Sequence, residues 1–258
     1  MAQTKWKIYV ATDLEGASGV WRFAQTRDRT SALYVQAVEY LMGDIAALVL
    51  GLREAGAARI VVADGHAGGD NFIPHLMEPG ATYITGKPRS PMEGLDKTFD
   101  GVVLLGYHAM KGTADGVLNH TRSSMTEMRY WYNERESGEI AQTALLTGHR
   151  GIPVIMVTGD TATCREARRF LGRSVIAVAT KRGISREAAE LYPLQETRTA
   201  IFEGAKKALG VLSRCRPYKL RMPIRCKREW IETTEHPSER RIEVREASIR
   251  DINKIYAF

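Results

Sequence analysis

The chain has 258 residues and a mass of 28.8 kDa, which suits one large α/β domain or a core domain with a smaller appendage. Hydrophobic residues make up 44% of it and charged residues 26%, ordinary globular values that exclude a disordered or fibrous chain. The formal net charge is +7, but residues 1–150 carry 15 Lys and Arg against 17 Asp and Glu, whereas residues 151–258 carry 22 against 13. The positive excess therefore belongs to the second part of the chain, and the charge of the whole does not by itself imply a polyanionic partner.

No segment of the sequence is typical of export or of a membrane-spanning helix. The N-terminal residues 1–7 are polar, and the longest apolar run, at residues 45–52, is shorter than the roughly 18–20 residues that a spanning helix needs. The three cysteines, Cys164, Cys215 and Cys226, have no CxxC spacing, which argues against a disulfide scaffold. We therefore expect a cytoplasmic protein that does not bind a membrane.

Short apolar runs alternate with longer amphipathic segments through most of the chain. In chain order, the patterns predict a strand at residues 7–12, a helix at 31–54, strands at 59–63, 81–85 and 101–105, a strand-like aromatic run at 128–133, a helix at 139–148, a strand at 154–157, a helix at 162–171, a strand at 174–179 and a helix at 196–212. This alternation favours an α/β fold with a mostly parallel sheet and helices on both faces.

The last forty residues have a different pattern. Residues 218–228 and 241–248 alternate apolar and charged side chains, and Pro217, Pro223 and Pro237 interrupt them. We therefore predict an α/β core at residues 1–200 and, at residues 201–258, a helix and a small, basic, β-rich C-terminal appendage. The appendage is expected to pack on the core or at an oligomer interface.

Acidic residues and histidines follow the predicted strands. Asp13 and Glu15 come after the first strand, His66 after the second and His108 after the fourth, and Glu139 begins a helix. In parallel sheets ligands bind at the carboxyl ends of the strands, and carboxylates with neutral imidazoles are ligands of Zn²⁺ or Mn²⁺. Three carboxylates gathered there would repel one another unless cations were bound. The set exceeds what one tetrahedral ion needs, so the pattern predicts two metal ions that share a carboxylate.

Each of these residues also has a plain structural explanation. A strand-end Asp is commonly a turn or cap residue, a lone buried histidine is commonly structural, and Glu139 suits the first turn of a helix. Separate caps have no reason to fall at successive strand ends with glycines beside them, so the combined pattern favours a metal site.

Several segments resemble the M55 peptidase family. The run from Ala11 to Gly19 resembles its SxDxEGxxG signature, with Ala11 in place of the serine. The resemblance extends over roughly residues 6–200 and includes Asp64-Gly65-His66, Gly106-Tyr107-His108-Ala109, Gly116-Val117-Leu118-Asn119-His120 and Gly138-Glu139.

The resemblance implies a zinc-dependent aminopeptidase with two Zn²⁺ ions per chain. It assigns the metal ligands to Asp13, Glu15, His66, His108 and Glu139, with Asp13 as the bridging carboxylate, and the catalytic histidine to His120. It also implies a ring-shaped homo-oligomer, a decamer of two pentamers. The implied substrates are short peptides or amino-acid amides with a free amino terminus and a D-residue in the first position.

The sequence also contains residues that suit other roles, and its metal-ligand pattern is compatible with a second class of enzyme. Arg122, Lys181 and Arg186 are candidate partners for a substrate carboxylate, whereas His75, His149 and His236 lack a position at a strand end. A dinuclear phosphoesterase would use the same kind of metal ligands.

A nucleic-acid-binding protein could use residues 206–228, since residues 204–228 hold nine Lys and Arg and no acid. That segment has Tyr218 as its one aromatic side chain, and the chain has no Walker or GxGxxG motif. Nucleic acid is therefore not the expected partner.

Overall fold

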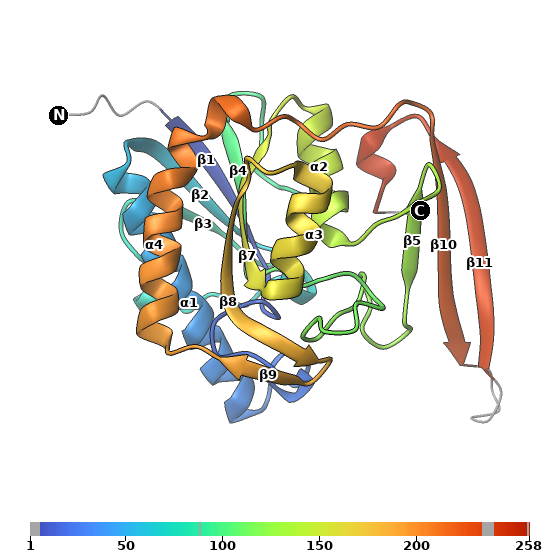
Figure 1. The fold of residues 1–258 in the computed structure, drawn as a ribbon, viewed down its shortest axis with the longest axis horizontal. Helices are drawn as coiled ribbons and strands as arrows, with labels where there is room; N and C mark the ends of the chain where they lie inside the picture. The colour runs from blue at the N-terminus through green and yellow to red at the C-terminus, as the bar shows by residue number, and fades with distance from the viewer. Residues whose placement is uncertain (1–5, 88, 234–239, 257) are drawn as a thin grey trace.

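The computed structural model describes residues 6–87, 89–233, 240–256 and 258, and these residues form two β-sheets with helices packed around the larger one (Figure 1). The larger sheet contains β1 (Trp6–Thr12), β2 (Ala57–Asp64), β3 (Thr82–Ile84), β4 (Gly101–Leu105), β7 (Val154–Asp160), β8 (Ile176–Ser185) and β9 (Ala188–Leu191). Its strand order is β3-β2-β1-β4-β7-β8-β9. All neighbours are parallel except β9, which runs antiparallel to β8.

The order of the strands creates a crevice at the centre of this sheet. Strand β1 pairs with β2 on one side and with β4 on the other. After β1 the chain adds β2 and β3 on one side of β1, and later it adds β4 on the other side of β1. The loops that follow β1 and β4 therefore diverge beyond the carboxyl ends of these two strands. This point in the sheet is where a ligand site is expected.

Helices cover both faces of the larger sheet, as predicted. The helices α1 (Ala32–Glu54) and α4 (Leu194–Gly210) pack against each other on one face, and α2 (Glu139–His149) and α3 (Thr161–Leu171) lie on the other (Figure 1). Each face has its own apolar core. Burial on both faces explains why the central strands are continuous apolar runs without alternation. The predicted α/β class is confirmed.

Helix α1 is the longest element and is strongly apolar. It begins where the Ser31 side chain accepts a hydrogen bond from the Tyr34 backbone N–H, at 3.2 Å. Its length and its mean hydropathy of 1.5 would suffice to cross a membrane, but 61% of the hydrophobic window is buried inside the protein. Its apolar composition serves the core, because it packs against both the sheet and α4.

The smaller sheet combines distant parts of the chain. It contains β5 (Arg129–Tyr132), β6 (Arg135–Glu136), β10 (Ile224–Thr233) and β11 (Arg240–Ile249), in the antiparallel order β11-β10-β5-β6. Tyr132 and Ile224 from this sheet pack with Leu145 and Leu146 of α2 in a third apolar core. The aromatic run predicted at residues 128–133 is thus the strand that joins the C-terminal hairpin to the core.

The predicted boundaries in the C-terminal part differ from the structure. The strand expected from residue 218 begins only at Ile224, after Pro223, which has no backbone N–H to donate to a neighbouring strand. The expected boundary between residues 200 and 201 falls inside α4, and β5 and β6 complete the sheet of the appendage. The division into domains itself stays a prediction.

The basic residues of the C-terminal part are spread over several elements. Lys206 lies on α4 and pairs with Glu54 at 2.7 Å, and Arg225 on β10 pairs with Glu134 at 2.7 Å. Residues 206–228 therefore form no single helix with one basic face.

The remaining short elements are 3-10 turns at Phe23–Gln25, His66–Gly68, Pro74–Leu76, Leu212–Arg214 and Ile252–Lys254.

Candidate metal centre

The candidate ligands converge at the carboxyl edge of the larger sheet. Asp13 and Glu15 follow β1, His66 follows β2 and His108 follows β4, and Glu139 is the first residue of α2. The Asp13 N–H donates to the Leu105 carbonyl at 2.8 Å, which holds the loop after β1 against the end of β4. All five side chains predicted from the sequence are brought together, and so is His120.

Glycines allow the loops of this edge to approach closely. A Cβ atom on Gly16 would lie 1.8 Å from the Tyr107 carbonyl oxygen, and one on Gly106 would lie 2.2 Å from the Asp13 carbonyl oxygen. Gly106 also has a φ of +74°, in the left-handed region that favours glycine. The two glycines therefore bring the backbones that carry Asp13 and His108 into contact.

The first cluster consists of Asp13, Glu15 and His66. The His66 Nδ1 atom lies 3.1 Å from Asp13 Oδ1 and 3.0 Å from Glu15 Oε2. All three residues are buried. On the far side of the ring, His66 Nε2 lies 2.9 Å from the Thr26 carbonyl oxygen.

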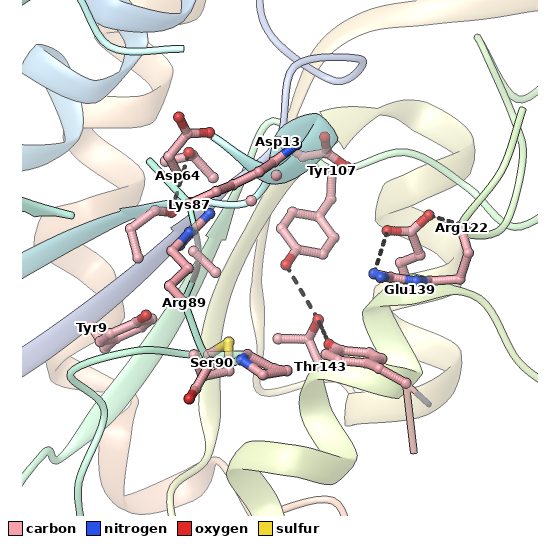
Figure 2. A pocket seen from close by; sticks show the side chains of 18 residues that line it. Tyr9, Asp13, Asp64, Lys87, Arg89, Ser90, Tyr107, Arg122, Glu139 and Thr143 are labelled. Atoms are coloured by element: carbon pink, nitrogen blue, oxygen red, sulfur yellow. Dashed lines mark hydrogen bonds and ion pairs between the residues drawn. The ribbon is translucent and has the colours of Figure 1, made fainter. Parts of the chain in front are cut away.

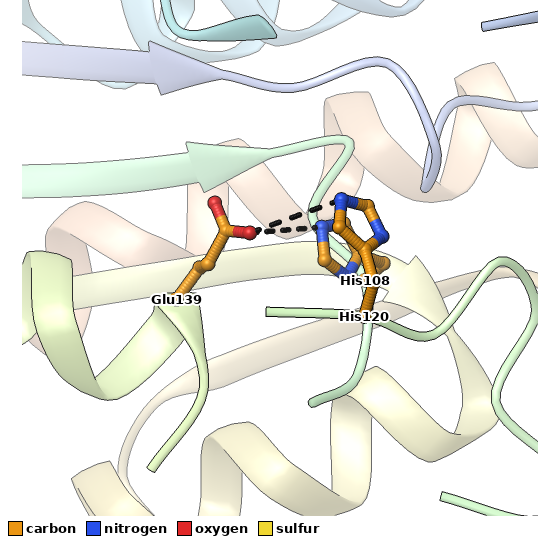
Figure 3. Close-up of side chains that lie close together, drawn as sticks. All are labelled: His108, His120 and Glu139. Atoms are coloured by element: carbon orange, nitrogen blue, oxygen red, sulfur yellow. Dashed lines mark ion pairs between the residues drawn. The ribbon is translucent and has the colours of Figure 1, made fainter. Parts of the chain in front are cut away.

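The second cluster consists of His108, His120 and Glu139 (Figure 3). The His108 Nε2 atom lies 3.5 Å from Glu139 Oε1, and His120 Nε2 lies 3.9 Å from the same oxygen. Asp13 links the clusters, because its Oδ2 atom lies 3.4 Å from His108 Nε2 while its Oδ1 atom faces His66. Asp13 thus lies between two groups of possible ligands.

Backbone carbonyls orient all three imidazoles. His108 Nδ1 lies 3.0 Å from the Ala109 carbonyl oxygen, and His120 Nδ1 lies 2.8 Å from that of Leu118. With His66 held by Thr26, each ring can donate one N–H to a carbonyl and turn its other nitrogen toward the carboxylates. This is the arrangement that fixes the tautomer of a metal-binding histidine.

Two buried atoms of the clusters have no hydrogen-bond partner among the described residues. They are Glu15 Oε2 and His108 Nε2. Both face oppositely charged groups, but no hydrogen bond of acceptable geometry satisfies them. A buried polar atom without a partner is costly, and a cation between the carboxylates and imidazoles would satisfy both.

The electrostatics of the site favour a bound cation. Burial and the charge of Glu15 raise the pKa of the Asp13 carboxyl to about 7. Although burial lowers the pKa of the His108 imidazole, the nearby Glu139 carboxylate and the charges of Asp13 and Glu15 raise it to about 10. Burial and the neighbouring His108 lower the pKa of His120 to about 4. The carboxylates thus create a negative potential in which a metal ion can replace protons.

Lys181 supports the loop that carries the first two ligands. Its side chain is completely buried, and its Nζ atom donates to the Glu15 carbonyl at 2.9 Å and to the Ala17 carbonyl at 2.8 Å. The neighbouring Thr180 hydroxyl donates to the Gly16 carbonyl at 2.7 Å. Strand β8 therefore holds three successive carbonyls of the loop after β1.

A cavity of 460 Å³ opens beside Asp13 and Glu139 (Figure 2). Tyr107, Thr143 and Tyr256 form one wall through a chain of hydroxyl contacts, at 3.2 Å and 3.0 Å. Its other lining residues include Tyr9, Asp64, Gly68, Lys87, Arg89, Met92 and Arg122. The volume lies within the range of about 300–1,000 Å³ that is typical of pockets for small molecules.

The secondary candidates from the sequence differ in their positions. Arg122 lines the cavity, whereas Lys181 is buried behind the loop and Arg186 pairs with Glu127 at 2.8 Å. Of the other histidines, His75 is exposed, His149 ends α2, and His236 lies outside the described residues.

Three cavity residues, Lys87, Arg89 and Tyr256, were not candidates from the sequence. They come from a loop and from the C-terminal segment, which no local pattern connects with the ends of the strands.

Comparison with known proteins gives consistent matches. A family model described as D-aminopeptidase, of the M55 peptidases, matches residues 6–243. A D-aminopeptidase of Bacillus subtilis (strain 168) is 32% identical over 193 residues, which cover 71% of this chain and 66% of the relative, slightly less than two thirds.

A solved structure has the same fold. It is described as the Zn-dependent D-aminopeptidase DppA from Bacillus subtilis, a self-compartmentalizing protease. Its TM-score is 0.87 at 24% identity, over 97% of this chain and 94% of that one.

Proposed function

Because this chain belongs to the M55 peptidase family, we propose that it is a zinc-dependent aminopeptidase that releases an N-terminal D-amino acid from short peptides or amino-acid amides. The Bacillus subtilis relatives carry the names D-aminopeptidase and Zn-dependent D-aminopeptidase, which support this activity and this metal. The observation that carries the proposal is the position of Asp13, with one carboxylate oxygen toward His66 and the other toward His108.

We assign the binding of two Zn²⁺ ions to the two clusters. Asp13, Glu15 and His66 would hold one ion, and His108 and Glu139 would hold the other, with Asp13 shared between them. The oxygen and imidazole donors and the unsatisfied Glu15 Oε2 and His108 Nε2 atoms fit such ions. Bound zinc would lower the pKa of a water molecule and polarise the scissile carbonyl of the substrate.

His120 is the proposed catalytic residue. Its Nδ1–H can donate to the Leu118 carbonyl, which leaves the lone pair of Nε2 directed into the site. Its lowered pKa keeps the ring neutral near pH 7, so Nε2 can accept the proton that the attacking water molecule gives up and then deliver it to the leaving amine. Because His120 also lies within the second cluster, a test of its role must measure metal content as well as turnover.

Acidic groups beside the cavity suit a substrate with a free amino terminus. Asp13 and Glu139 both line the cavity, so a peptide amine can enter next to the proposed metal ligands. Such an anchor for the amine would restrict cleavage to the first residue of a peptide. The D-configuration of that residue is proposed from the family alone.

Oligomerisation is part of the proposal. The solved Bacillus subtilis protein is described as self-compartmentalizing, and we propose a homo-oligomer for this chain, as a decamer of two pentamers. Light scattering coupled to size-exclusion chromatography would give its mass. A monomer at micromolar concentration would contradict this part of the proposal.

A substrate screen tests the activity. Zinc-loaded protein and protein treated with a chelator are compared on D- and L-alanyl amides and dipeptides, with a chromogenic phosphodiester as the control for a phosphoesterase. We expect hydrolysis of the D-substrates that is lost on chelation and restored by zinc, with about two zinc ions per chain by mass spectrometry. Hydrolysis of the phosphodiester alone would refute the aminopeptidase.

A further inference from the structure

The cavity beside the proposed metal site contains cations that the proposed chemistry does not use. Arg122, Lys87 and Arg89 all line it. Arg122 is already engaged, because its guanidinium lies 3.9 Å from Glu139 Oε2 and 4.5 Å from the centre of the Tyr256 ring. Lys87 and Arg89 have no carboxylate within ion-pair distance among the described residues.

The acidic side chains near this pair are occupied by other donors. Asp64 accepts hydrogen bonds from the Asn71 backbone and side chain, each at 2.8 Å, and from the Thr85 hydroxyl at 2.9 Å. Glu93 Oε2 lies 3.2 Å from the Ser90 backbone N–H, which donates to it. The two positive charges of Lys87 and Arg89 are therefore available to a ligand in the cavity.

The segment that carries the pair is attached to the loop of His66. The Thr85 hydroxyl accepts from the Asp70 N–H at 2.9 Å and donates to Asp64, at the end of β2. Gly68 leaves room for the lysine, since a Cβ atom there would lie 2.0 Å from Lys87 Cε. These contacts keep Lys87 beside the loop that follows β2, and Arg89 enters the cavity from the same segment.

Within the cavity, Glu139 lies apart from Lys87 and Arg89, whereas Asp13 and Asp64 lie nearer to Lys87 (Figure 2). Figure 2 shows Lys87 and Arg89 on one side and Glu139 with Arg122 on the other, with Tyr107 between them. Asp13 and Glu139 suit a positively charged amine, and the free cations suit an anion. The guanidinium of Arg89 can form two parallel hydrogen bonds with a carboxylate, while Lys87 adds a point charge.

We propose that Lys87 and Arg89 form a subsite for the C-terminal carboxylate of a short peptide. A dipeptide carries an amine at one end and a carboxylate at the other, which matches the charges of the cavity. The protein would then favour dipeptides with a free carboxylate over substrates that end in an amide. This inference rests on the proposed aminopeptidase activity and specifies the substrate class of the same site.

The test uses two substrates that share one scissile bond. D-alanyl-D-alanine is compared with its C-terminal amide in the wild-type holoenzyme, in Arg89→Met, in Lys87→Met/Arg89→Met and in the control Arg173→Met, which alters an exposed arginine between α3 and β8. We expect the wild type and the control to favour the free acid by roughly 10–100-fold in kcat/KM, mainly through KM, as expected for a charge-assisted contact. The double variant should lose most of this preference, and Arg89→Lys should restore part of it.

The outcomes separate this inference from the proposed function. Equal kcat/KM values for acid and amide in the wild type, or an unchanged preference in the double variant, would overturn the subsite while leaving the aminopeptidase intact. If the wild type cleaves neither compound, the proposed function fails. In that case, calorimetry with the same two compounds tests the subsite. The subsite is supported if the acid binds more tightly to the wild type than to the folded double variant, and it is refuted if the two bind the acid equally.

Discussion

The imidazole rings of His108 and His120 are stacked, with their centres 4.0 Å apart and their planes at 13°. Both Nε2 atoms face the same oxygen of Glu139. The neighbours affect the two rings in opposite ways, since Glu139 and the other carboxylates raise the pKa of His108 and burial beside His108 lowers that of His120. One ring is thus suited to hold a cation or a proton, and the other to remain neutral.

Replacement of His120 tests the division of roles. We expect His120→Ala to reduce turnover by roughly 10²–10⁴-fold, because the site loses the group that transfers a proton, while zinc content stays near two ions per chain. Turnover and zinc content are measured on the same preparation, with the exposed His75→Ala as control. Undiminished turnover would refute the catalytic role, and the loss of one zinc ion would identify His120 as a ligand.

Lys181 is expected to act on the metal site through the backbone. Lys181→Met keeps the length of the side chain but removes both hydrogen bonds to the carbonyls of Glu15 and Ala17. We expect zinc affinity to fall by roughly 10–100-fold, as for other groups that orient ligands. Competition with a fluorescent chelator measures this, and Lys207→Met on the exposed side of α4 serves as the matched control. Unchanged zinc affinity would contradict a positioning role.

Gly16 is expected to tolerate no side chain. In Gly16→Ala the new methyl group would overlap the Tyr107 carbonyl, so the loops after β1 and β4 would have to separate. We expect a destabilisation of about 2–4 kcal/mol, or failure to fold, measured by chemical denaturation. The comparison is Gly210→Ala at the end of α4, where a Cβ meets nothing within 4 Å. Equal stability of the two variants would disprove the close contact.

Asp44 gives a prediction about pH. Burial raises its pKa to about 6 from an ordinary value of 3.8, although the Ser18 N–H donates to it at 2.8 Å. Between these values the folded protein retains a proton that the unfolded chain has lost, so the free energy of unfolding decreases as pH rises from about 4 to above 6. The decrease attributable to this residue is about 2–3 kcal/mol.

The variant Asp44→Asn removes this contribution. The free energy of unfolding of the variant minus that of the wild type should be about 2–3 kcal/mol larger at pH 7.5 than at pH 4. The exposed Glu39→Gln should show no such trend. Urea denaturation at a series of pH values measures the difference. A constant difference across the range would show that Asp44 has the same pKa in the folded and the unfolded chain, which would contradict the prediction.

The sequence by itself indicated the fold class and the residues that now form the two clusters. Apolar strands without alternation are buried on both faces, and parallel strands end at a common edge, so side chains such as Asp13, His66 and His108 had to meet there. The stacking of His120 on His108 and the sharing of Asp13 between clusters depend on loop conformations that no local periodicity specifies.

Only the tertiary structure decided what surrounds these clusters. Lys87 and Arg89 reach the cavity through the packing of one loop against another, and Tyr256 reaches it because β5 pairs with β10 and brings the C-terminal segment to α2. Such contacts join residues that are far apart in the chain, and they follow from side-chain packing and backbone approach rather than from repeating patterns. The residue types at the strand ends, and the chemistry that they support, can therefore be predicted from the sequence. The shape and charge of the cavity depend on the tertiary structure.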